Sequence, residues 1–95
     1  MGRKHYIIRV HGRVQGVFYR ASARSHALAL DLKGFAQNQH DGSVYIEAEG
    51  DEENLKQFVE WCRRGPDRAE VTEVLVEEVP LNHFSSFEVN RGKYH

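Results

Sequence analysis

The sequence contains a single cysteine, Cys62, so no intramolecular disulfide can form. That thiol lies beside Trp61 in an amphipathic stretch, where a packing role is more common than a chemical one. Long apolar runs are also missing, since none approaches the roughly 20 residues that a membrane-spanning helix needs. No apolar block follows the basic residues Arg3 and Lys4, as a signal peptide would require. We therefore expect a cytoplasmic protein without a membrane partner.

An excess of charge of either sign is absent as well. The 13 Lys and Arg residues are balanced by 14 Asp and Glu residues, which leaves a formal net charge of -1. No overall field then favours nucleic acid or an anionic membrane, and any anion site must be local. A length of 95 residues, with 40% hydrophobic and 28% charged residues, is typical of one globular unit. We expect a single domain over residues 1–95 that is monomeric.

Hydrophobic periodicity predicts an α+β fold. Strands are expected over residues 4–11, closed by Gly12, over 33–39 and 43–50 around a turn at 39–42, over 69–79, and in a short final segment at 87–90. Helices are expected over residues 19–30 and from the Asp51 N-cap to Gly65-Pro66. A slip in the alternation between Val71 and Val74 indicates a bulge. This order predicts a ferredoxin-like βαββαβ sandwich, an antiparallel sheet with both helices on one face.

The strand expected over residues 43–50 has one apolar and one polar face. Its apolar face consists of Val44, Ile46 and Ala48. The alternating residues on its polar face are Tyr45, Glu47 and Glu49. Because antiparallel sheets commonly bury only one face, we expect the polar face to be exposed to water.

The segment GRVQGVFYR, residues 12–20, connects the first strand to the first helix. Glycines permit the backbone angles with which successive N–H groups form a concave anion site, and a helix N-terminus adds partial positive charge. Arg20 opposes that helix dipole, which indicates an anionic partner for its guanidinium. Such a loop is also commonly a plain connection. The Walker and G-x-G-x-x-G patterns are absent, so nucleotide binding is not expected.

Two motifs in this chain resemble those of a known family. GRVQGVFYR is similar to the acylphosphatase signature G-x-V-Q-G-V-x-F-R, and GFAQNQHDGSV at residues 34–44 is similar to that family's G-W-x-x-N-x-x-D-G-[ST]-V. The resemblance continues through residues 65–71 and 84–91 and so covers essentially the whole chain. The departures are few: Tyr19 stands for the usual Phe, Phe35 for a common Trp, and Asp31 for a frequent Gly.

The resemblance implies hydrolysis of acyl phosphates, which are small molecules, to a carboxylate and inorganic phosphate without a metal or cofactor. By position, the phosphoryl group would be cradled by the backbone amides of Gln15, Gly16, Val17, Phe18, Tyr19 and Arg20. The Arg20 guanidinium would clamp its oxygens, and the Asn38 side-chain amide would hold the attacking water. Inorganic phosphate or sulfate would occupy the same site. Because the conjugate acid of the departing carboxylate has a pKa of roughly 4, no general acid is needed.

Other functions receive less support from the residues. His5 and His11 lie roughly 20 Å apart along a strand and cannot share a metal ion, and His40 is expected to be a turn residue. An RNA-binding module of the same topology would need an aromatic signature that is absent. It would also meet repulsion from four glutamates, Glu47, Glu49, Glu77 and Glu78. A catalytically silent anion-binding module stays open as an alternative.

Overall fold

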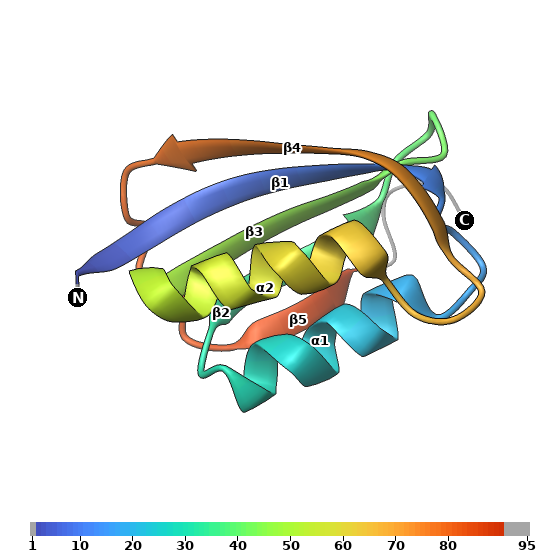
Figure 1. Cartoon of the computed structure of the whole chain (residues 1–95). Coiled ribbons are helices and arrows are strands. Elements are labelled where there is room, and N and C mark those ends of the chain that lie inside the picture. Colours follow the sequence, from blue (N-terminus) through green and yellow to red (C-terminus); the bar gives the residue numbers. More distant parts are fainter. Residues whose placement is uncertain (1, 91–95) are drawn as a thin grey trace.

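The computed structural model of the chain describes residues 2–90 and shows two helices packed on one face of a five-stranded sheet (Figure 1). The strands are β1 (Arg3–Arg13), β2 (Lys33–Asn38), β3 (Val44–Asp51), β4 (Glu70–Val79) and β5 (Phe87–Asn90), and the helices are α1 (Tyr19–Ala29) and α2 (Glu52–Arg64). The ferredoxin-like α+β prediction is confirmed. No helix within residues 2–90 has the length and apolar character that crossing a membrane requires.

The sheet has the strand order β4-β1-β3-β2-β5. The pairs β1–β3, β1–β4 and β2–β3 are antiparallel, as predicted, whereas β2–β5 is parallel. The parallel pair arises because the chain crosses from β4 at one edge to the opposite edge and reverses direction on the way. The sheet is therefore mixed, and its last strand lies beside β2 and α1 (Figure 1).

Gly12 does not end the first strand, contrary to the expectation from the sequence. β1 continues through Gly12 to Arg13, with Gly12 at φ 126. A Cβ at this position would lie 2.1 Å from the carbonyl oxygen of Glu70, so only glycine fits. The register passes from His11 opposite Glu73 to Gly12 opposite Val71, which confirms the predicted bulge in β4. Pairing with β4 thus extends up to the loop that follows β1.

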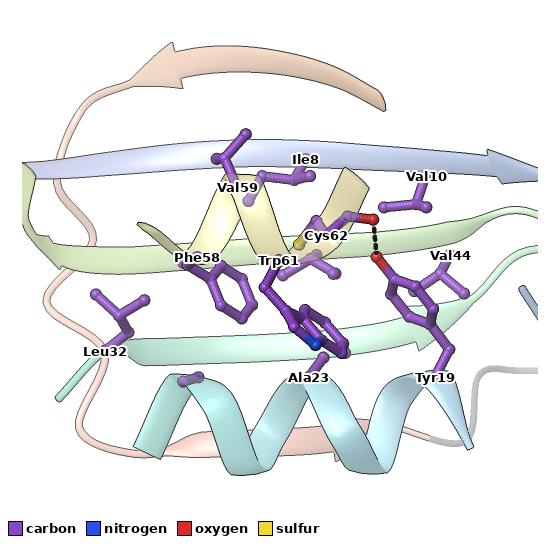
Figure 2. Close-up of a cluster of buried hydrophobic side chains, with 14 of the residues drawn as sticks. Ile8, Val10, Tyr19, Ala23, Leu32, Val44, Phe58, Val59, Trp61 and Cys62 are labelled. Carbon is purple, nitrogen blue, oxygen red and sulfur yellow. Dashed lines mark hydrogen bonds between the residues drawn. The ribbon is translucent and has the colours of Figure 1, made fainter. Parts of the chain in front are cut away.

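The core fills the space between the sheet and the two helices (Figure 2). Ile8 from β1 and Phe58 from α2 are fully buried there, and each such side chain contributes about 1.5–3 kcal/mol by leaving water. Trp61 of α2 is only 6% exposed. The rings of Tyr19 and Phe58 pack against it, and the His26 ring of α1 stacks on it at 4.5 Å between ring centroids. The two helices therefore pack against each other through these aromatic rings, and both also pack on the sheet.

The opposite face of the sheet is only partly exposed to solvent. The expectation that Glu49 is exposed there was wrong. Glu49 is 0% exposed because residues 80–86, which connect β4 to β5, pass over it. Its carboxylate accepts hydrogen bonds at 2.6, 3.0 and 2.8 Å from the backbone amides of Asn82, His83 and Phe84. Burial alone would raise the pKa of Glu49, but these three donors hold it below its usual value. The carboxylate is therefore buried, and its charge is stabilised by these hydrogen bonds.

Candidate active site

The loop between β1 and α1 has the backbone conformation of an anion-binding nest. Gly16 has φ 72 and Phe18 has φ 63, while Val17 between them has a negative φ. Such alternation turns successive N–H groups toward one side. Within residues 2–90, the amides of residues 15–18 donate no backbone hydrogen bond. The helix that begins at Tyr19 has neither a side-chain cap nor an acidic residue in its first turn, so its free N–H groups face the same region.

The Gln15 side chain joins this loop to the β2–β3 hairpin. Its Nε2 donates to the carbonyl oxygens of Gln39 at 2.8 Å and of Ser43 at 2.9 Å. The hairpin turn is itself closed by Asp41, whose Oδ1 accepts from the Ser43 amide at 2.9 Å and from the Ser43 hydroxyl at 2.6 Å. The hydroxyl bond is the main reason that the pKa of Asp41 lies below its usual value. Sequence reasoning used only the Gln15 backbone and missed this link, for which no sequence pattern exists.

Arg20 lies in the first turn of α1 and is held by the last strand. Its Nη1 donates to the carbonyl oxygen of Asn90 at 2.7 Å, and one helical turn later Nε of Arg24 donates to that of Phe87 at 3.1 Å. Among residues 2–90 no carboxylate forms an ion pair with Arg20. A neutral carbonyl orients the guanidinium but does not neutralise it. Its charge therefore remains available to an anion.

Asn38 is the last residue of β2 and faces the same place. Among the side chains of residues 2–90, its Oδ1 is the buried polar atom that has no hydrogen-bond partner. Buried acceptors are nearly always paired, so an orphan of this kind calls for a ligand or a functional role. The Gln15 bonds to the carbonyl oxygens of Gln39 and Ser43 hold this end of β2 beside the loop.

Arg20 and Asn38 line one hollow of about 270 Å³, which we call the site hollow. Its other lining residues include Gly16, Phe18 and Tyr19, all predicted, and Val14, Ala21 and Val89, which sequence reasoning did not single out. Gln15 and Val17 are not among them. The Gln15 side chain bonds to the hairpin instead, and the Val17 side chain is buried. The structure thus brings together the two predicted catalytic side chains, with Val89 supplied by β5.

The Tyr19 side chain belongs to the core and not to the hollow's chemistry. It is 1% exposed, and its hydroxyl donates to the Cys62 carbonyl oxygen at 2.8 Å (Figure 2). The helical partner of that carbonyl would be the amide of residue 66, which is a proline without an N–H. The buried hydroxyl thus has a polar partner in the core. Burial raises the pKa of Tyr19, and it raises the pKa of the Cys62 thiol to about 12, so that the thiol stays protonated.

The histidines do not gather around the hollow. His40 is exposed in the β2–β3 turn and is absent from the hollow's lining. His5 is buried beneath residues 80–84, where Nδ1 lies 2.7 Å from the Pro80 carbonyl oxygen and Nε2 lies 2.8 Å from Oε1 of Glu47. Within the described part of the chain, no three His, Cys, Asp or Glu side chains group as metal ligands would.

Comparison with known proteins places these features in a family. The acylphosphatase family model matches residues 6–89, which include the loop, Arg20 and Asn38. The chain belongs to the acylphosphatase family. It is 45% identical to an acylphosphatase of Colwellia psychrerythraea over 83 residues, covering 85% of this chain and 93% of the relative. It is 51% identical to an acylphosphatase of Marinobacter nauticus over 79 residues, covering 82% of this chain and 86% of that one. The crystal structure of an acylphosphatase from Bacillus subtilis matches with a TM-score of 0.90 at 38% identity, covering 92% of this chain and 98% of the other.

The three departures from the acylphosphatase motifs leave Arg20 and Asn38 in place. Asp31, at a position often occupied by glycine, has φ 58, a conformation that glycine favours and Asp tolerates. Phe35 lies on the opposite face of the sheet, where its ring contacts those of Tyr45 and Phe84 at 5.9 and 6.0 Å. Tyr19 reaches the core. None of the three departures therefore alters the Arg20 or Asn38 side chain.

Proposed function

We propose that this chain hydrolyses the carboxyl–phosphate bond of acyl phosphates in the site hollow, independently of metal and cofactor. The observation that carries the proposal is the convergence of the Arg20 guanidinium and the unpaired Oδ1 of Asn38 on one hollow beside a nest of amides, in a member of the acylphosphatase family. A phosphoryl group and a water molecule are the ligands that complement this set.

The phosphoryl group binds to the nest and to Arg20. The amides of residues 15–20 donate to its oxygens, and the guanidinium adds a charge-assisted pair of hydrogen bonds. Because the Asn90 carbonyl engages Nη1, the guanidinium plane is oriented before the substrate arrives. A dianion is thereby held by local positive charge, although the chain as a whole has a net charge of -1.

The attacking water binds to Asn38. An oxygen such as Oδ1 can only accept, so a water that donates to it directs a lone pair toward the phosphorus. The water oxygen bonds to phosphorus while the bond from phosphorus to the acyl oxygen breaks, and the electron pair leaves with the carboxylate. The water's proton passes to an oxygen of the substrate's phosphoryl group. No side chain has to act as an acid, because the leaving carboxylate is stable without a proton.

Hydrogen-bond donors held in place around the phosphoryl group accelerate the proposed hydrolysis. In phosphoryl transfer the charge spreads over three equatorial oxygens, and fixed donors around them stabilise it without rearrangement. One such donor contributes about 3 kcal/mol, or a factor of 10² to 10³ in kcat. The nest and Arg20 together therefore account for a large part of the required catalysis.

Release of phosphate from acetyl phosphate, measured in metal-free buffer with EDTA, tests the proposal. We expect turnover to survive chelation, and a loss of rate on chelation would mean that a metal takes part. Arg20→Gln should lower kcat by about 10² or more, whereas the matched control Arg24→Gln should retain it. Arg24 is a suitable control because it lies on the same helix, bonds to the same strand and does not line the hollow. A near wild-type kcat for Arg20→Gln would refute the clamp.

Asn38→Ala separates the water site from the phosphate site. It should lower kcat with little change in the inhibition constant of inorganic phosphate, since its ligand is the water. An equally large rise in that constant would contradict the assignment. If the wild-type protein binds phosphate but releases none from acetyl phosphate, the chain is a silent anion-binding module instead.

A further inference from the structure

Phe18 occupies an unfavourable backbone conformation and an unfavourable environment at the edge of the site hollow. A large aromatic residue rarely adopts a left-handed conformation, yet Phe18 has φ 63 and ψ 22. Its side chain is 77% exposed, more than any other large hydrophobic residue within residues 2–90. The loop conformation explains the direction of its amide but not the choice of an aromatic side chain. An apolar ligand would explain that choice.

Phe18 also separates the site hollow from a second one. The second hollow, of about 530 Å³, is lined by Val17, Phe18, Ser22, Pro66, Asp67 and Arg68. Phe18 is the residue that lines both, whereas neither Arg20 nor Asn38 lines the second hollow. A ligand that leaves the site hollow past Phe18 therefore enters a space that neither Arg20 nor Asn38 lines.

The far wall of the second hollow is held in place by the core. The Tyr19 hydroxyl bonds to the last turn of α2, and a Cβ at Gly65 would lie 3.0 Å from the Tyr19 ring. The chain then turns at Pro66, whose carbonyl oxygen accepts from the Ala69 amide at 3.0 Å. Residues 66–68 thus lie at a set position beside the loop, and no part of the proposed hydrolysis uses them.

The acyl part of the substrate has a defined direction if the proposed function holds. The attacking and leaving oxygens lie roughly in line on opposite sides of phosphorus. With the water at Asn38, the carboxylate and its acyl group leave on the side away from Asn38. The second hollow adjoins the site through Phe18 and is not lined by Asn38, so it is available to an acyl group that is larger than acetyl and leaves away from Asn38.

We propose that the Phe18 ring and the second hollow bind the acyl group, and that the preferred substrates are acyl phosphates with a bulky, uncharged, apolar acyl group. The inference rests on the proposed function. The exposed Phe18 ring and Pro66 provide apolar surface, while the neighbouring charges of Asp67 and Arg68 are opposite and leave no net preference for a charged acyl group. Phe18 is accordingly a specificity-determining residue, in addition to its amide's place in the nest.

The ratio of kcat/KM for benzoyl phosphate to that for acetyl phosphate measures this contact. Both substrates share the phosphoryl group, so effects on the nest cancel in the ratio. Phe18→Asn removes the ring with a residue that tolerates positive φ. We expect the wild-type protein to prefer benzoyl phosphate and this variant to lower the ratio roughly tenfold. Phe18→Leu, which stays apolar, should keep most of the preference.

Leu28→Asn is the matched control, because Leu28 is an exposed apolar residue, 49% accessible, on α1 and outside both hollows. Its ratio should equal that of the wild-type protein. A ratio that is unchanged in Phe18→Asn, with both substrates turned over, overturns the role of Phe18 and leaves the proposed hydrolysis standing. Absence of phosphate release from either substrate by the wild-type protein overturns the hydrolysis and this inference together.

Discussion

Replacement of Tyr19 by Phe should destabilise this protein, although Phe is the usual residue of the family at this position. The Tyr19 hydroxyl donates to the buried Cys62 carbonyl, and it replaces the backbone donor that Pro66 lacks. In the variant the ring still fills its place, but the carbonyl is left without a partner in the core. The change isolates one hydrogen bond with almost no change in volume.

The expected loss follows from the burial of both groups. A buried polar group left unpaired costs about 1–3 kcal/mol, and the smaller desolvation of Phe offsets part of it, which leaves about 1–2 kcal/mol. For a domain of this size 1 kcal/mol lowers Tm by about 4–8 °C, so a loss of about 1–2 kcal/mol predicts a fall of roughly 4–16 °C. That is a large fraction of the stability of a small domain.

Thermal and urea unfolding followed by circular dichroism measure this loss. The control is Tyr6→Phe, since the half-buried Tyr6 has a hydroxyl without a hydrogen bond to residues 2–90. Its Tm should stay within about 2 °C of the wild-type value. If Tyr19→Phe melts as late as Tyr6→Phe, the hydroxyl adds no net stability, and the assignment of Tyr19 as a substitute for the missing proline donor is wrong.

Two further predictions concern stability. Above the usual carboxyl pKa of 4.5, the three amide bonds to ionised Glu49 stabilise the fold, and this contribution is lost as pH falls through the lower folded pKa. Urea unfolding should therefore give Glu49→Gln a free energy of unfolding roughly 2 kcal/mol below that of the wild-type protein at pH 7, and a smaller difference at pH 3. A difference in stability that does not change with pH would contradict the assignment. Gly65→Ala combines φ 70 with a Cβ 3.0 Å from the Tyr19 ring, so it should lower Tm more than Gly42→Ala, which has φ 93 and open space. Equal losses in the two variants would show that contact with Tyr19 is unimportant.

The elements predicted correctly are those whose evidence is local. The apolar spacing at Leu55 and Phe58 depends only on the helical period, and the Asp41-Gly42 turn depends only on its neighbours. The phase slip after Val71 likewise marks a bulge within one strand. Gly12 was misjudged because its glycine signals a close approach to Glu70, far along the chain, as readily as it signals the end of a strand.

The sequence by itself determined the order of helices and strands and the family resemblance, and it singled out Arg20 and Asn38 as candidates, because periodicity and motif spacing are properties of neighbouring residues. Only the tertiary structure decided what surrounds them. The Asn90 carbonyl that holds Arg20 is 70 residues away, and the carbonyls that hold Gln15 are 24 and 28 residues away. Every residue has a backbone carbonyl, so the pattern of side chains in the sequence cannot predict which carbonyl will accept these hydrogen bonds. The fold selects it by bringing distant backbone segments within hydrogen-bond distance.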